Sequence, residues 1–211
     1  MKMGAIFTHL TAAAAVFLST SPLLFAEEAK PPCCRELPVG APLSDRSIYQ
    51  LETKWTSDVG RIVTLGVLRG HLQVVAMFFT TCEASCPVIV DDMKHLQQAL
   101  PDPLRDKVDF LLVSFDSERD TPEVLRAYRQ KMRLPMEHWT LLRGGADDVR
   151  ELAAILGVNF QKDARGQFMH SNVITVLNRE GEVVWQQTGV RSEPLPMIQA
   201  LEQAALAVRP R

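Results

Sequence analysis

The apolar positions of this chain fall into short continuous runs and longer segments with helical spacing. Two runs, residues 74–79 and 110–115, are apolar apart from Ser114 and are typical of strands buried on both faces of a parallel sheet. Three shorter strands are predicted further along, at residues 139–142, 173–177 and 182–185. The last two flank a turn-rich link at residues 178–181 and therefore predict an antiparallel hairpin.

Helical patterns separate these strands. After Pro87, four apolar residues recur at helical spacing: Val90, Met93, Leu96 and Leu100. Pro101 closes this helix, and Thr121-Pro122 opens the next, which runs to about Met132. Two more helices are predicted over about residues 147–156 and 194–208. The order β-α-β-α-β-α-β-β-α describes a thioredoxin-like α/β sandwich, with a central mixed sheet flanked by helices and a C-terminal β-hairpin.

The N-terminal residues read differently. Residues 1–26 contain no acidic residue and a single Lys or Arg, Lys2, followed by a mostly apolar run and a small residue at Ala26, which is typical of a secretory signal peptide. Polar residues interrupt the run, so it is too short for a membrane-spanning helix. We therefore expect an exported, periplasmic protein, soluble after cleavage or membrane-tethered if uncleaved. Residues 27–60 are rich in proline and predict an extended arm, and residues 61–208 the folded domain.

Composition narrows the function classes. The chain has 211 residues, a formal net charge of -2 and a pI near 6.2, so it lacks the basic surface that a nucleic-acid partner requires. Its 4 cysteines are too few for a disulfide-stapled scaffold. Two of them, Cys33 and Cys34, lie in the predicted arm, where three roles stay open: an accessory copper-capturing pair, an intermolecular disulfide, or dispensable residues.

The main chemical signal is Cys82 and Cys86, which lie between the first buried strand and its helix. Open α/β folds bind their ligands at this position. The free amide donors of a helix start favour thiolates there. A purely structural disulfide is poorly motivated because it would close a very short loop. Three intervening residues, where redox pairs usually have two, favour a soft metal ion, above all Cu(I), without excluding thiol-disulfide exchange.

His170, just before the strand at residues 173–177, is a candidate third ligand, because in a thioredoxin-like topology its loop packs beside the cysteines. A lone histidine next to an apolar strand is also compatible with a structural role. The remaining histidines that follow the predicted signal peptide, His71, His95 and His138, are expected to be structural or solvated.

Three blocks of residues resemble the SCO/SenC family of copper-handling, thioredoxin-like proteins over about residues 38–205. They are residues 78–87, residues 113–125, which contain Asp116-Ser117-Glu118-Arg119-Asp120-Thr121-Pro122, and His170-Ser171. The resemblance implies that Cys82, Cys86 and His170 together bind copper, as Cu(I) and with Cu(II) left open. It also implies delivery of copper to the copper subunit of an apo-cytochrome oxidase during assembly. Another periplasmic copper chaperone is a further candidate partner, and we expect a monomer or weak dimer.

Two positions depart from the family pattern. Glu83 replaces a proline and is expected to raise the pKa of both thiols by its negative charge. Met169 replaces an acidic residue and offers a thioether, although packing is the commoner use of such a methionine. Asp116 looks like the acidic residue that the family has near the metal, and we expect it to orient a ligand or a partner.

The rival hypothesis uses the same two cysteines without a metal. In it the protein is a thiol-disulfide oxidoreductase, with Cys82 and Cys86 as a catalytic redox pair that reduces the cysteines of the apo-oxidase. Peroxide reduction on the same fold has no specific support in the sequence. The two main hypotheses assign different roles to His170, which only the copper hypothesis requires.

Overall fold

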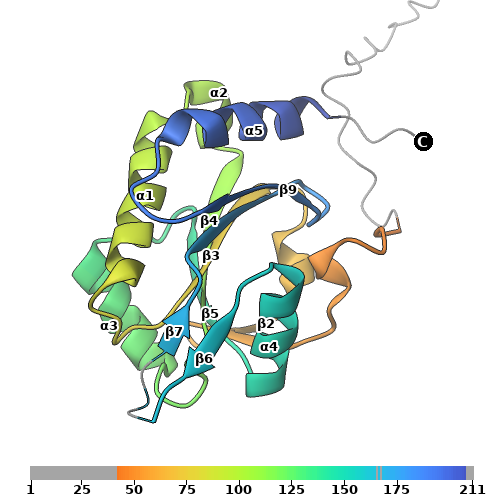
Figure 1. Cartoon of the computed structure of the whole chain (residues 1–211). Coiled ribbons are helices and arrows are strands. Elements are labelled where there is room, and N and C mark those ends of the chain that lie inside the picture. Colours follow the sequence, from red (N-terminus) through yellow and green to blue (C-terminus); the bar gives the residue numbers. More distant parts are fainter. Residues whose placement is uncertain (1–41, 165, 167, 208–211) are drawn as a thin grey trace, which may run out of the picture. The chain divides into compact units, whose positions relative to one another are not determined.

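The computed structural model describes residues 42–164, 166 and 168–207, which belong to one compact unit of the chain, residues 36–211 (Figure 1). The predicted signal peptide and the pair Cys33 and Cys34 lie outside the described residues. No helix within the part of the chain that is described has the length and apolar content needed to cross a membrane.

A seven-stranded mixed sheet with the order β2-β1-β5-β4-β3-β8-β9 forms the centre of the fold (Figure 1). Its strands are β1 (Trp55–Ser57), β2 (Ile62–Val63), β3 (Leu72–Phe78), β4 (Val108–Ser114), β5 (Trp139–Arg143), β8 (Val173–Leu177) and β9 (Val183–Thr188). Strands β3, β4 and β5 are parallel, whereas β8 pairs antiparallel with both β3 and β9. The predicted central mixed sheet and C-terminal hairpin are therefore confirmed.

Helices cover both faces of the sheet. They are α1 (Ser85–Ala99), α2 (Asp102–Arg105), α3 (Pro122–Met132), α4 (Ala146–Ile155) and α5 (Pro194–Leu206), with short 3-10 helices η2 (Ile48–Gln50) and η3 (Leu65–Leu68). Figure 1 shows α1 and α3 on one side of the sheet and α4 on the other. The Thr121 side chain accepts a hydrogen bond from Val124 N–H, which confirms the predicted start of α3.

The two continuous apolar runs form the most buried strands. Every residue of β3 is buried, and so is every residue of β4 except Asp109. Helices on both faces remove these strands from water, which is why their sequences do not alternate. Phe110 stacks on Trp139 across β4 and β5, with ring centroids 4.8 Å apart. The core of the domain therefore lies directly behind the strand ends that carry the predicted site.

The predicted boundary between arm and domain at residue 60 is wrong. Ile48 and Trp55 are fully buried, and β1 pairs with β5 inside the main sheet. The Trp55 ring lies against Gly144, where an added Cβ would come within 2.6 Å of it. This segment was missed because its core contacts are single large residues between prolines and charged residues, which produce no periodic pattern.

A second small sheet was also missed. Strands β6 (Phe160–Lys162) and β7 (Phe168–His170) form a two-stranded antiparallel ribbon, in which His170 pairs with Phe160. The sequence placed His170 in a loop, whereas the structure places it at the end of β7. The ribbon lies close to α4 and the starts of α1 and α3 in Figure 1, at the end of the sheet where β3 and β4 terminate.

Candidate metal centre

Cys82 and Cys86 lie where β3 gives way to α1. β3 ends at Phe78 and α1 begins at Ser85, so Cys82 is in the connecting loop and Cys86 in the first helical turn. The backbone N–H of Cys86 donates to Cys82 Sγ over 3.4 Å. Both thiols are free and buried. The spacing of the two cysteines thus brings both sulfur atoms to the start of one helix.

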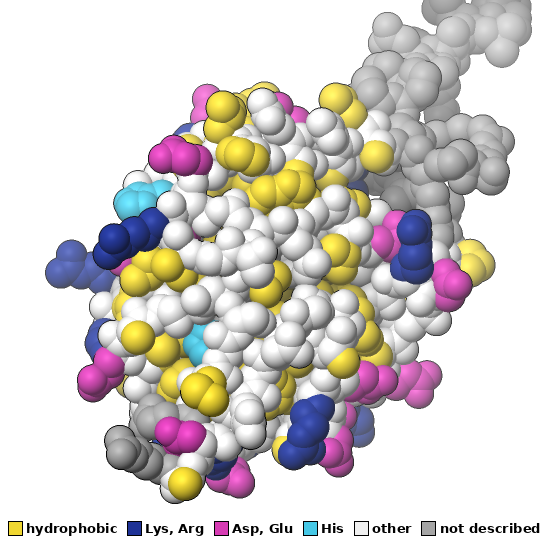
Figure 2. All heavy atoms as spheres, viewed as in Figure 1, with side chains coloured by type: hydrophobic (Ala, Val, Ile, Leu, Met, Phe, Trp, Pro, Cys, Tyr) yellow, Lys and Arg dark blue, Asp and Glu magenta, His cyan; other side chains and the backbone are white. Residues whose placement is uncertain are grey.

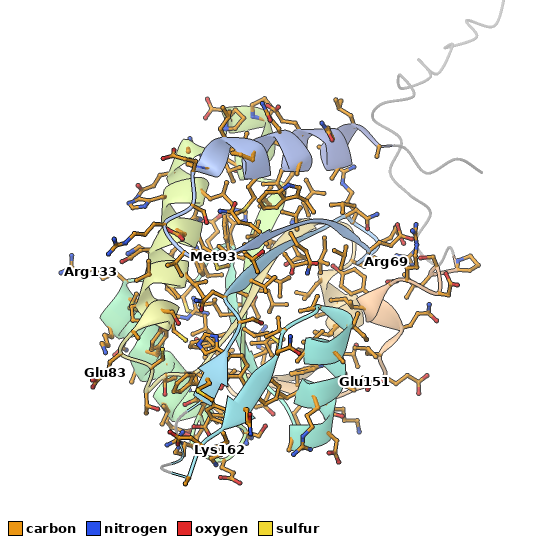
Figure 3. All side chains as sticks on the ribbon, viewed as in Figure 1. Arg69, Glu83, Met93, Arg133, Glu151 and Lys162 are labelled. Carbon is orange, nitrogen blue, oxygen red and sulfur yellow. The ribbon has the colours of Figure 1, made fainter. Side chains whose placement is uncertain are left out.

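The two thiols differ in acidity. Burial acts to raise the pKa of Cys82, but hydrogen bonds from Cys86 and from the backbone of Ala84 and Ser85 outweigh it, and the pKa falls below its ordinary value of 9.0. At Cys86 burial dominates and raises the pKa far above that value. Glu83, which was expected to raise both pKa values, is not among the groups that shift either of them. Glu83 is exposed and lies at the margin of the molecule in Figure 3.

His170 is held with one ring nitrogen facing the cysteines. Its Nδ1 lies 3.1 Å from the carbonyl oxygen of Ser171, an acceptor, so Nδ1 carries the proton. The lone pair of Nε2 then faces Cys86 Sγ and Ser85 Oγ, each 3.4 Å away. Burial lowers the pKa of His170 and keeps the imidazole neutral. A carbonyl that fixes the tautomer in this way is the usual support of a metal-binding histidine.

Aromatic rings form the wall behind His170. Its ring centroid lies 5.0 Å from that of Phe115 and 5.9 Å from that of Phe79, the latter edge to face. Phe168, on the same strand as His170, lies 5.2 Å from Phe79. This wall keeps water from one side of the imidazole, which is the physical cause of its lowered pKa.

Cys82, Cys86 and His170 form the single group of metal-ligating side chains among the described residues whose donor atoms all lie within 4.8 Å of one another. A three-coordinate ion with bonds of about 2.0–2.3 Å holds its donors about 3.5–4.0 Å apart. Small side-chain movements therefore suffice to close these donors around an ion. Two sulfurs and one imidazole select a soft ion, for which Cu(I) is the best match.

Asp120 supports the cysteine loop, a contact that the sequence did not reveal. Its carboxylate, fully buried, accepts hydrogen bonds from the Thr80 backbone N–H at 3.1 Å and from the hydroxyls of Thr80 and Ser114. Thr80 precedes Cys82 by two residues, so Asp120 ties the loop to the end of β4. No local pattern in the sequence indicates this role of Asp120, because the contact spans 40 residues.

Asp116 is buried but faces elsewhere. Its carboxylate forms an ion pair with Arg119, whose guanidinium also donates to the Gly166 carbonyl over 2.6 Å. The carboxylate accepts hydrogen bonds from the backbone and guanidinium of Arg119, and the Asp116 backbone N–H donates to Ser114 Oγ. None of these bonds involves a cysteine or histidine of the site. Orientation of a ligand by Asp116 thus has no contact that supports it. Met169 is 66% exposed and adjoins His170 on β7, where neighbouring side chains point to opposite faces of the strand.

We expect the Asp120→Asn variant to change how stability depends on pH. Burial, the largest cause, raises the pKa of Asp120 above its ordinary 3.8, so the folded state binds the proton more tightly than the unfolded state. This contribution to stability is complete below pH 3.8 and is lost as the pH rises through the higher folded-state value. As the pH rises from about 3.5 to 7, roughly the range of carboxyl titration, loss of this contribution lowers the unfolding free energy of the wild type. Urea unfolding across this range should therefore show a smaller fall for the variant than for the wild type. Equal falls in the two proteins would contradict this assignment.

Comparisons with known proteins agree with this site. The chain is 25% identical over 161 residues to the SCO1 protein homolog of Bacillus subtilis (strain 168), covering 74% of this chain and 82% of the relative. It superimposes with a TM-score of 0.67 on a SCO1/SenC family lipoprotein from Bacillus anthracis str. Ames, at 25% identity over 78% of this chain and 99% of the other.

A third structure is that of ScoI from Bradyrhizobium japonicum with copper bound. It has a TM-score of 0.61 and 22% identity, and the match covers 72% of this chain and 96% of that one, which shows a common fold. A model of the SCO1/SenC family matches residues 45–205, which include all three donor residues. Because this match spans most of the sequence, the chain belongs to the SCO1/SenC family.

Proposed function

We propose that this chain is an exported copper carrier that binds Cu(I) through Cys82, Cys86 and His170 and passes it to the copper subunit of a cytochrome oxidase during assembly. The observation that carries the proposal is the position of His170, whose unprotonated Nε2 lies 3.4 Å from Cys86 Sγ in a three-donor group. Copper bound to the related ScoI of Bradyrhizobium japonicum supports the choice of metal.

A site with three donors allows bound Cu(I) to be released to an acceptor protein. Three ligands leave Cu(I) open to attack by a thiolate or thioether of the acceptor, so copper can move through an intermediate shared by both proteins. Cys82 and His170 come from the loop and ribbon around the site, while Cys86 is fixed in α1. Figure 2 shows histidine surface among hydrophobic and uncharged groups near β7, a surface on which an acceptor can dock without charge repulsion.

Export and the partner rest on the sequence and the family. Residues 1–26 have the pattern of a signal peptide, and the related Bacillus anthracis protein is a lipoprotein, which supports a position outside the cytoplasm. Family membership supports the cytochrome oxidase as acceptor.

The test is an anaerobic titration of the fully reduced protein with Cu(I) against a competing chelator. One tight equivalent is expected, and His170→Ala should weaken it, because the remaining two thiols leave the ion without its nitrogen ligand. Cys33→Ser/Cys34→Ser should leave it unchanged. A wild type that cannot compete with the chelator would refute the copper proposal.

A second candidate function is favoured by the opposite pKa shifts of the two thiols. The Cys82 thiolate would attack a disulfide of the partner and form a mixed disulfide, releasing one partner thiolate. Cys86, once deprotonated, would then attack Cys82 Sγ, forming the Cys82–Cys86 disulfide and releasing the second partner thiolate. In this function a reduced dithiol is consumed at each turnover and His170→Ala changes the rate little. Exchange with a disulfide peptide in the absence of Cu(I) binding would identify this function.

A further inference from the structure

A second group of metal-ligating side chains lies at the opposite end of the sheet. His71 immediately precedes β3, Asp109 is the second residue of β4, and His138 immediately precedes β5. These strands are parallel neighbours in the order β5-β4-β3, so their starting residues lie along one edge. At about 3.3 Å per residue along β3, this edge lies roughly 20 Å from the cysteines.

One carboxylate holds both imidazoles. Asp109 Oδ2 lies 3.0 Å from His71 Nδ1, and Asp109 Oδ1 lies 2.8 Å from His138 Nδ1. A second acidic group, Glu137, lies 3.9 Å from His138 Nε2. The side chains are accessible to a small ion, since they are 51% exposed at His71, 26% at Asp109 and 21% at His138.

The backbone of His138 is unusual. Its φ is 62°, in the left-handed region that few residues other than glycine adopt. Its carbonyl oxygen accepts the Phe110 N–H over 2.7 Å, which fixes the residue at the start of β5 beside β4. Strained backbone of this kind is concentrated at functional positions. Here it accompanies the placement of the imidazole against Asp109.

We propose that His71, Asp109 and His138 bind a divalent ion of borderline softness, Zn(II) or Cu(II), at a site separate from the cysteines. Two imidazoles and one carboxylate are a ligand set that such ions prefer, and the set contains no thiolate to favour Cu(I). The carboxylates of Asp109 and Glu137 beside the two imidazoles supply negative charge that attracts a cation. Each imidazole moves its proton from Nδ1 to Nε2 and presents the Nδ1 lone pair to the ion.

The site must rearrange when an ion binds. The nitrogen to oxygen distances of 2.8 and 3.0 Å are those of hydrogen bonds. Among the described residues, the group of three donors that already lies within 4.8 Å is the cysteine site, so the donors of this second site are not yet gathered as closely. An ion with bonds of about 2.0–2.2 Å needs room between its donors, so each ring must move away from the carboxylate oxygen that it now contacts and the two rings must approach one another. His71, half exposed, is free to do so. The competing explanation is that Asp109 merely joins the starts of three strands by hydrogen bonds.

The experiment uses the full chain with Cys33, Cys34, Cys82 and Cys86 replaced by serine and with His170→Ala, so that the thiols and the first site are absent. Its fold is first checked by circular dichroism. Cu(II) sulfate is titrated against glycine as competitor, and electron paramagnetic resonance counts the nitrogen ligands; Zn(II) is titrated against a chromophoric chelator. We expect one equivalent of either ion and a signal from two imidazoles.

Two variants remove one ligand each. His71→Ala and His138→Asn should weaken binding at least about tenfold, and asparagine is chosen because it tolerates left-handed backbone. His95→Ala, which removes an exposed histidine of α1, is the matched control and should change nothing. Binding that is absent, or equally strong in all variants, would overturn the proposal. The result is independent of the copper proposal because the background protein lacks that site.

Discussion

The Cys86→Ser variant is expected to lose tight Cu(I) binding. Cys86 is fully buried, and its sulfur lies 3.4 Å from His170 Nε2, so it forms the centre of the three-donor group. Serine keeps the backbone N–H that donates to Cys82 Sγ, but it replaces a soft thiolate by a hard hydroxyl. Structural zinc sites bind their ion with about 10–16 kcal/mol through four ligands, or about 3 kcal/mol for each ligand. By analogy, loss of one of the three ligands here should lower the affinity by roughly two orders of magnitude or more.

Ser85→Ala provides the matched control. Ser85 Oγ lies 3.4 Å from the same His170 nitrogen, but a hydroxyl is a poor ligand for Cu(I). The control should therefore bind Cu(I) as the wild type does in an anaerobic competition titration. If Cys86→Ser retained wild-type affinity, the ion would be held elsewhere, and repeating the titration with Cys33→Ser/Cys34→Ser would show whether the N-terminal pair holds it.

The sequence predicted the donors of the site better than their surroundings. Cys82 and Cys86 stand between a buried strand and a helix, a local pattern that a single sequence displays. His170 could be proposed because its chain position and the family resemblance agreed. The support from Asp120 and the wall at Phe115 arises from contacts between segments far apart in the chain, which spacing does not encode. Asp116 was preferred over Asp120 because it looks like the acidic residue that the family has near the metal, whereas the structure shows that Asp120 contacts the cysteine loop.

The same distinction applies to the fold. Strands β3 and β4 were predicted because burial on both faces produces continuous apolar runs. Strand β1 and the ribbon of β6 and β7 are only three residues long each, too short for a detectable period. Trp55 and the position of His170 depend on these short strands. Tertiary contacts, rather than local propensity, therefore determine both the true start of the domain and the third donor of the site.

The Arg129→Met variant is expected to destabilise the domain strongly. Arg129 of α3 and Asp58, in the link between β1 and β2, form a buried ion pair with side chains 6% and 3% exposed. The guanidinium donates to both carboxylate oxygens and to the carbonyls of Pro135 and Trp139. Methionine fills similar volume but leaves the Asp58 carboxylate buried without its partner, which costs about 3–5 kcal/mol. For a domain of this size the melting temperature should fall by roughly 10 °C.

This prediction also tests where the domain begins, because Asp58 lies in the segment that the sequence assigned to the arm. Arg150→Met is the control, since Arg150 pairs with Asp147 on the surface of α4 and both side chains are largely exposed. Thermal and urea unfolding should show no measurable change for the control. The double variant Asp58→Ala/Arg129→Met should recover part of the loss, because no unpaired charge then remains. If Arg129→Met were as stable as the control, the segment around Asp58 would contribute little to the folded domain.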